Sequence, residues 1–294
     1  MVQRSFIVGS KWLYYKIYTG PKSSDFVLTE VILPLLQRFQ SNNWIEKWFF
    51  IRYADPKHHL RIRFLVTDVA ATQNMMSHLF DGLEPLVKKD VIWKVQLDTY
   101  HRELERYGEN TMQLSESLFC HDSWATVQFV NLIEGDEGEK LRWLYGLRSI
   151  DNLLTAFAYP LQEKFELLEI LKIGFGREFN MSRPLKKQLD DKYRKERQNI
   201  EHFMTFLIRE ELEYASILTI LEETYTNIIP LAQQILDLEK KNQLQIPKNN
   251  LMSSYIHMLM NRLFKSKNRL NEMVCYDFLY RYYRTAKAKS TIKS

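Results

Sequence analysis

Arginine, histidine and apolar residues alternate in the stretch HHLRIRFL, residues 58–65. Successive side chains of a β-strand point to opposite faces, so Arg61 and Arg63 would project from one face together with His59. Two guanidinium groups on one face suit a carboxylate, a phosphate or a developing oxyanion. A solvent-exposed sheet face would give the same pattern without any ligand, so spacing alone leaves both interpretations open.

A second group of arginines lies in DTYHRELERYGEN, residues 98–110. Arg102 and Arg106 are four residues apart and would share a face if the segment were helical. The glutamates between them are candidate ion-pair partners, which is the purely structural explanation. Gly108 is placed to end such a turn.

A third group lies in SSYIHMLMNRLF, residues 253–264. Helical spacing puts Ser253, His257 and Asn261 on one stripe and apolar residues on another. A histidine within reach of several arginines would be kept neutral by their positive charge. A neutral imidazole can accept a proton as a general base. A buried histidine with satisfied hydrogen bonds is the alternative.

Composition and motifs narrow the possible functions. The chain has 294 residues, a formal net charge of +5, and 45% hydrophobic and 26% charged residues. These values are typical of a soluble globular protein, and the mild positive charge permits an anionic partner without requiring one. No GxxxxGK(S/T), GxGxxG, HExxH or GxSxG motif is present, so nucleotide, zinc and serine-hydrolase sites lose their simplest support. The charge-dense stretch 186–197 mixes both signs, which favours a solvated helix face over a nucleic-acid surface.

The cysteines and the apolar runs indicate a cytoplasmic protein. Cys120 and Cys275 have no metal-ligand spacing, and we expect free thiols in a reducing compartment. No apolar run reaches the roughly 18 residues of a membrane-spanning helix, and the N-terminus lacks a signal-peptide pattern. We therefore expect neither a membrane nor a metal site.

The periodicity of the sequence predicts an α+β fold. The expected elements of the first part are a strand over 11–18, a helix from a cap at Ser24 or Asp25 to about Gln40, a hairpin of 47–53 and 59–66 around Asp55–Pro56, a helix over Val69–Lys88 and a strand over 91–100. Longer helical patterns follow, over 115–132, 137–174, 183–210, 211–240, 248–263 and 270–286. We expect one compact domain over 1–294, with an α+β part (1–112), a mainly helical part (113–288) and a frayed basic tail (289–294).

Three blocks, WFFIRYADPKHHLRIRF, TYHRELERYG and SSYIHMLMNR, resemble in this order the lantibiotic-dehydratase C-terminal family, also called the thiopeptide-type bacteriocin biosynthesis domain. The opening KWLYYKIYTGPKSSDFVLTEVILPLL and the stretch ESLFCHDSWA are similar to further blocks of that family. The resemblance extends over about residues 10–264.

This resemblance implies a lyase that needs no metal or organic cofactor. In full-length class I dehydratases, an N-terminal domain adds glutamate from glutamyl-tRNA to Ser or Thr of a precursor peptide. The C-terminal domain then eliminates glutamate and leaves dehydroalanine or dehydrobutyrine. Carried over block by block, the family's essential residues become Arg61, Arg63, either Arg102 or Arg106, and His257. Expected substrate-binding residues are Arg52, His59, Tyr100, Ser254, Asn261 and Arg262.

The implied partners are a ribosomally made precursor peptide, with leader and core, and a separate glutamyl-tRNA-dependent glutamylating protein. The chain would act as a stand-alone elimination protein without binding nucleic acid directly, and a homodimer is compatible with the sequence. Some similar proteins are instead thiopeptide pyridine synthases, which join two dehydroalanines in a formal [4+2] cycloaddition and expel the leader peptide. A third alternative is a non-catalytic partner that binds a leader peptide by strand addition.

The sequence departs from the family pattern after the second block, where RYGE replaces the usual RYGG. Glu109 would be strained if the backbone there has a positive φ.

Overall fold

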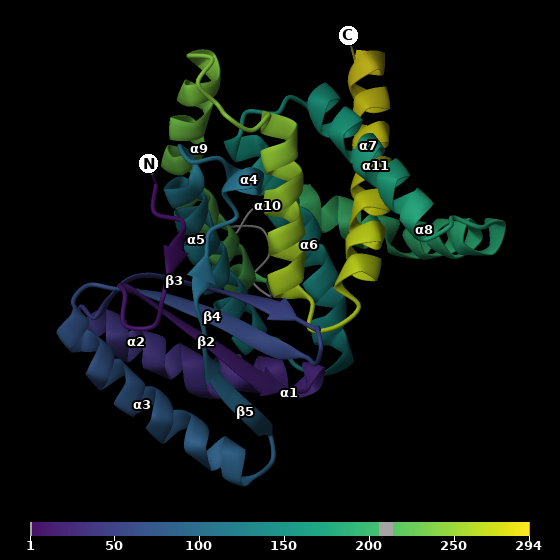
Figure 1. The fold of residues 1–294 in the computed structure, drawn as a ribbon. Helices are drawn as coiled ribbons and strands as arrows, with labels where there is room; N and C mark the ends of the chain where they lie inside the picture. Colours follow the sequence, from purple (N-terminus) through teal and green to yellow (C-terminus); the bar gives the residue numbers. More distant parts are fainter. Residues whose placement is uncertain (1, 206–213, 294) are drawn as a thin grey trace.

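An antiparallel sheet lies in the lower half of the molecule in the view of Figure 1. The computed structural model describes residues 2–205 and 214–293. Within this part, four strands pair in the order β3-β4-β2-β5. Their bounds are Trp12–Thr19 (β2), Ile45–Tyr53 (β3), His59–Val66 (β4) and Ile92–Leu97 (β5). β3 and β4 form the predicted hairpin, in which Arg61 pairs with Ile51 of β3 and with Lys16 of β2.

Three helices and a π-helical segment cover one face of the sheet: α1 (Pro21–Phe26), η1 (Val27–Ile32, π-helical), α2 (Leu33–Ser41) and α3 (Val69–Lys88). Leu60, Ile62 and Phe64 of β4 are buried in the core on this side. The alternation in β4 therefore sends its apolar residues to one face and His59, Arg61 and Arg63 to the other, as the sequence predicted. We call the second face the helical-region face.

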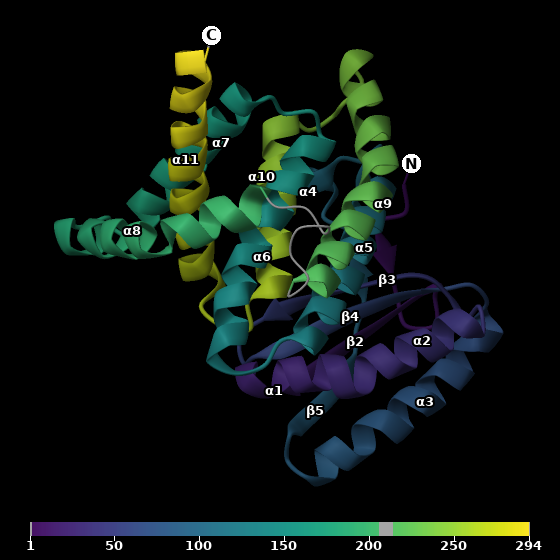
Figure 2. The same cartoon turned by 180° about the vertical axis from the view of Figure 1, so that it is seen from behind.

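The remaining elements rise from the helical-region face (Figures 1 and 2). Two short strands, β1 (Ser5–Phe6) and β6 (Tyr100–His101), pair with each other. The helices that follow β6 are α4 (Leu104–Tyr107), α5 (Met112–Leu132), α6 (Gly135–Ala156), α7 (Leu161–Glu178), α8 (Arg183–Thr205), α9 (Ala215–Lys240), α10 (Lys248–Leu263) and α11 (Asn268–Lys293). One hydrophobic core continues from Trp12 and Phe49 of the sheet into these helices. The predicted α+β class and the single compact domain are confirmed.

Side chains of two helices replace a neighbouring strand along the outer edge of β3. The Asn261 amide of α10 accepts a hydrogen bond from the Arg52 backbone N–H and donates one to its carbonyl, both at 2.8 Å. Arg262 Nε donates to the Phe50 carbonyl, and Ser123 Oγ of α5 accepts from the Phe50 N–H. An open sheet edge attracts further strands, so these contacts protect the edge and fix the end of α10 against it.

A buried cluster of charges joins the sheet to the helices. Asp25 accepts hydrogen bonds from Arg52 Nη2 at 2.6 Å and from Arg142 Nη2 at 2.8 Å. Burial opposes ionisation of this carboxyl, but the two guanidinium groups outweigh that effect and hold the pKa of Asp25 below its ordinary value. Asp25 therefore acts as the shared counter-ion of two buried cations.

The predicted start of the first helix was wrong, because Ser24 and Asp25 bind the buried Arg52 and do not cap the helix. The helix begins at Pro21, with Gly20 at the N-cap, and not at Ser24 or Asp25. Proline suits the first helical position because its fixed φ is already helical. Ser24 Oγ accepts a hydrogen bond from Arg52 Nη1 at 2.6 Å.

Three other predicted boundaries needed correction. The helix over 137–174 is two helices, because Ala158 adopts φ 56° and Pro160 is the N-cap of α7. The strand over 91–100 ends at Leu97 before the separate strand β6. The last helix runs to Lys293, through most of the segment expected to fray. The predicted junction at residues 210 and 211 lies outside the described residues.

Both cysteines are free and buried. Among the helices of the described residues, none is long and apolar enough to cross a membrane.

Candidate active site

The guanidinium group of Arg63 lies among aromatic rings. Its Cζ is 4.5 Å from the ring centre of Tyr14, 4.9 Å from Tyr100 and 5.2 Å from Phe49. Only 8% of the residue is exposed, and Nε has no hydrogen-bond partner within the described residues. Ring faces attract a cation without neutralising it. Arg63 therefore keeps an uncompensated positive charge on the helical-region face.

Arg61 lies next to Arg63 along the same face and is also held without a carboxylate. Its guanidinium stacks 3.5 Å from the ring centre of Tyr53, and its Nε donates to His59 Nε2 at 3.0 Å. His59 Nδ1 in turn donates to the Lys57 carbonyl. Burial, followed by the positive charges of Arg61 and Lys16, lowers the pKa of His59. The predicted substrate-binding His59 thus contacts Arg61 as a neutral imidazole.

The structure separates the two arginines that the sequence could not distinguish. The sequence analysis placed Arg102 and Arg106 on one helical face if the segment were helical. Arg102 precedes α4, so the two arginines do not share such a face. Arg102 is 4% exposed and donates from Nε and Nη2 to the two carboxylate oxygens of Glu116, at 2.7 and 2.6 Å. The Tyr100 hydroxyl donates to the same carboxylate. Arg106 lies on α4 with a 44% exposed side chain and pairs with Glu103 at 3.2 Å.

The turn after α4 does not strain Glu109. Gly108 takes the positive φ, 74°, and ends α4 as expected, whereas Glu109 is not among the positive-φ residues. The Glu109 N–H donates to the Gln245 side chain.

A small cavity of about 30 Å³ lies where the sheet, α4, α5 and α10 meet. Its lining includes Arg63 from the sheet, Glu103 and Tyr107 from the α4 region, and Met258 and Arg262 from α10. Arg63 Nε and Arg262 Nη2 are buried N–H groups that lack an acceptor among the described residues. Two such donors favour an anionic or carbonyl oxygen between these elements.

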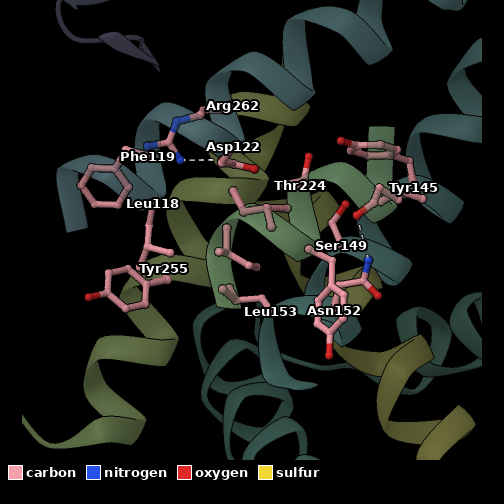
Figure 3. A pocket seen from close by; sticks show the side chains of 14 residues that line it. Leu118, Phe119, Asp122, Tyr145, Ser149, Asn152, Leu153, Thr224, Tyr255 and Arg262 are labelled. Carbon is pink, nitrogen blue, oxygen red and sulfur yellow. Dashed lines mark hydrogen bonds and ion pairs between the residues drawn. The ribbon is translucent and has the colours of Figure 1, made fainter. Parts of the chain in front are cut away.

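A second cavity, of about 40 Å³, lies deeper among the helices (Figure 3). Arg262 reaches its edge and donates from Nη1 to Asp122 at 2.7 Å. Burial raises the pKa of Asp122, against the opposing effect of the Arg262 charge. Both cavities are large enough for a water molecule or two but not for a peptide. The second is lined by helices alone and by no residue of the sheet, so it belongs to the interior.

His257 lies on α10 but faces α11 and does not line the small cavity. Its Nδ1 is 3.0 and 3.2 Å from the two carboxylate oxygens of Glu272. Its side chain is 29% exposed. Ser254 lies half-buried one turn from Met258 on the cavity side of α10. Asn261 and Arg262, expected to bind substrate, support the edge of β3.

Residues 12–283 match the family described as "Lantibiotic biosynthesis dehydratase C-term". The chain belongs to this family. Nisin biosynthesis protein NisB of Lactococcus lactis subsp. lactis is 24% identical over 274 residues, which are 91% of this chain and 25% of NisB. Subtilin biosynthesis protein SpaB of Bacillus subtilis is 26% identical over 159 residues, which are 54% of this chain and 15% of SpaB. The chain thus spans a quarter or less of the length of these relatives.

Solved structures share the fold. The tRNA-dependent lantibiotic dehydratase MibB of Microbispora sp. 107891 has a TM-score of 0.72 at 20% identity, over 93% of this chain and 28% of MibB. TsrL has a TM-score of 0.66 at 13% identity, over 96% of each chain. The pyridine synthase TbtD, from thiomuracin biosynthesis, has a TM-score of 0.62 at 13% identity, over 92% of this chain and 97% of TbtD.

Within this family fold, Arg102 and Arg106 should respond differently to mutation. Arg102→Gln leaves the Glu116 carboxylate buried with only Tyr100 as a strong donor, so we expect a loss of about 3 kcal/mol in unfolding free energy. Arg106→Gln should change stability by no more than about 0.5 kcal/mol. Urea unfolding of both variants measures this contrast, and equal losses would contradict it.

Proposed function

We propose that this protein is a lyase that removes glutamate from glutamylated Ser or Thr of a ribosomal precursor peptide. The observation that carries the proposal is the pair Arg61 and Arg63. Both lie on one sheet face and, among the described residues, neither has a carboxylate partner. The helix of Arg106 and the helix of His257 border the same face. Membership in the family supports a dehydratase-type reaction, and MibB, a tRNA-dependent lantibiotic dehydratase, shares the fold.

The reaction needs these cationic and basic groups. A base removes the Cα proton of the modified residue, and negative charge develops on the peptide carbonyl oxygen. The electron pair then forms the Cα–Cβ double bond as the Cβ–O bond breaks, and glutamate leaves as an anion. Arg61 and Arg63 stabilise the enolate or the departing glutamate, because preorganised cationic donors favour developing negative charge. His257 transfers the proton as general base, or returns it to the leaving group, and Arg106 completes the anion site.

The proposed substrate is a precursor peptide that a glutamyl-tRNA-dependent activity has already glutamylated. The first experiment is mass spectrometry of a synthetic peptide with one glutamylated Ser after incubation with the purified protein. We expect loss of glutamate and formation of dehydroalanine. An ester that survives under conditions where the protein is folded would refute elimination.

A pyridine synthase is the second candidate. TbtD, a pyridine synthase from thiomuracin biosynthesis, shares the fold of this chain with a TM-score of 0.62. A peptide with two dehydroalanines distinguishes the candidates, because a ring product with release of the leader would indicate cycloaddition. No change in either peptide would favour a non-catalytic peptide-binding partner.

Arg61→Lys should lower the elimination rate about tenfold to a hundredfold. Lysine keeps the charge but loses the planar fork that binds an anion through two hydrogen bonds, and a charge-assisted hydrogen bond contributes about 1.5–3 kcal/mol. Single-turnover rates of the glutamylated peptide measure the effect. Lys94→Arg, on β5 of the same sheet, is the matched control and should retain the wild-type rate. Full activity of Arg61→Lys would contradict a bidentate contact.

A further inference from the structure

A buried carboxylate lies directly behind His257. Glu272 of α11 is 2% exposed, and its oxygens are 3.0 and 3.2 Å from His257 Nδ1. α10 and α11 lie side by side in both views (Figures 1 and 2). The contact between His257 and Glu272 joins the two helices. Glu272 lies outside the sequence blocks that identified the arginines and His257.

Other side chains hold this carboxylate in place. The Tyr276 hydroxyl donates to Glu272 Oε1 at 2.7 Å, and Arg269 Nη1 donates to Oε2 at 3.1 Å. Arg269 also forms an ion pair with Glu178 of α7 and stacks over Phe175. Each oxygen of Glu272 thus has one donor besides the imidazole, and its orientation is fixed from both sides.

The arrangement determines which imidazole nitrogen carries the proton. A carboxylate only accepts hydrogen bonds, and an unprotonated Nδ1 at this distance would place two lone pairs against each other. Arg269 Nη1 is farther from Nδ1, at 3.4 Å, and donates to Glu272. Nδ1 of His257 therefore carries a proton, and in the neutral imidazole the lone pair lies on Nε2.

We propose that Glu272 is a positioning residue for the elimination reaction: it fixes His257 in the Nδ1–H tautomer and leaves Nε2 free to accept the Cα proton. This inference rests on the proposed function. Glu272 also stabilises the imidazolium that forms when Nε2 takes the proton, because its negative charge lies next to Nδ1. The groups that face His257 from the neighbouring helices are Glu272 and Arg269, with Glu178 behind Arg269.

The test compares Glu272→Gln with Glu178→Gln. A glutamine amide can donate to Nδ1 and favour the opposite tautomer, so Glu272→Gln should lower kcat about a hundredfold or more while KM changes little. Glu178→Gln alters the same Arg269 network without touching the imidazole and should keep kcat within about twofold. A Glu272→Gln protein with wild-type kcat would overturn the proposal, as would equal losses in both variants.

A second measurement does not depend on activity or on the folding of a variant. Imidazole ¹⁵N shifts of the wild-type protein should show His257 as the Nδ1–H tautomer, and Glu272→Gln should shift the population towards Nε2–H. An Nε2–H tautomer in the wild type would overturn the positioning role even if elimination is observed. If the wild type shows the Nδ1–H tautomer but no elimination, the proposed function fails and the positioning role for elimination fails with it.

Discussion

His257→Ala should lower the rate of glutamate elimination about 10²–10⁴-fold, the usual contribution of a positioned general acid or base. The loss should appear in kcat, because the imidazole acts on the proton in transit and contributes little to peptide binding. Glu272 keeps its hydrogen bonds from Tyr276 and Arg269 in this variant. We therefore expect the protein to remain folded. Single-turnover mass spectrometry of the glutamylated peptide measures the rate, and thermal unfolding checks the fold.

His78→Ala is the matched control for this experiment. His78 lies on α3, on the opposite side of the sheet, where its ring stacks on Trp44. Removing that ring should leave the elimination rate within about twofold of the wild type. A His257→Ala protein with undiminished kcat would show that another group moves the proton. Retained cycloaddition activity in that variant would point to the pyridine-synthase alternative.

The sequence predicted what depends on short-range periodicity. Alternation within residues 59–66 gave both the strand and the face on which Arg61 and Arg63 lie, because the period of two is a local property of the strand. The turn at Asp55–Pro56 predicted the hairpin, and Gly108 predicted the end of α4. Predicted helix boundaries were wrong at two kinds of site. Ser24 and Asp25 resemble helix caps but bind the distant Arg52, and Pro160 interrupts a helical pattern that looked continuous in the sequence.

The partners of the charged residues could not be predicted. Asp25 and Arg142 are 117 residues apart, and Arg52 and the Arg262 carbonyl that it contacts are 210 apart. No spacing rule reaches across such separations. Glu272 was missed for a related reason, since a single glutamate among the polar residues that begin a helix resembles a solvated surface residue until the helices are packed.

The environment of each arginine separates structural from functional candidates. Where a carboxylate neutralises a buried guanidinium, the arginine holds separate segments together. This group contains Arg52, Arg102, Arg142 and Arg262, of which Arg262 also directs its unpaired Nη2 donor to the small cavity. Arg61 and Arg63 lie instead over aromatic rings, which leave the positive charge available. Identical residue types in one motif thus differ in role through the groups that surround them.

Asp25→Asn should lower the unfolding free energy by at least about 3–5 kcal/mol, because it leaves two buried guanidinium groups without their shared counter-ion. Arg52 and Arg142 are both nearly inaccessible to solvent and would keep only neutral acceptors and the more exposed Glu139. Urea unfolding near pH 7 measures the loss. Asp81→Asn, on the exposed surface of α3, is the control and should change stability by less than about 0.5 kcal/mol.

The pH dependence of the same comparison tests the charge itself. The pKa of Asp25 is lower in the folded protein than its ordinary value of about 3.9. Its stabilising contribution is therefore complete above about pH 4 and is lost as the pH falls through the folded-state pKa. The difference in unfolding free energy between wild type and Asp25→Asn should be constant from pH 7 to about pH 5 and shrink below about pH 4. A difference that persists unchanged at lower pH would mean that the shape of the side chain, and not its negative charge, stabilises the cluster.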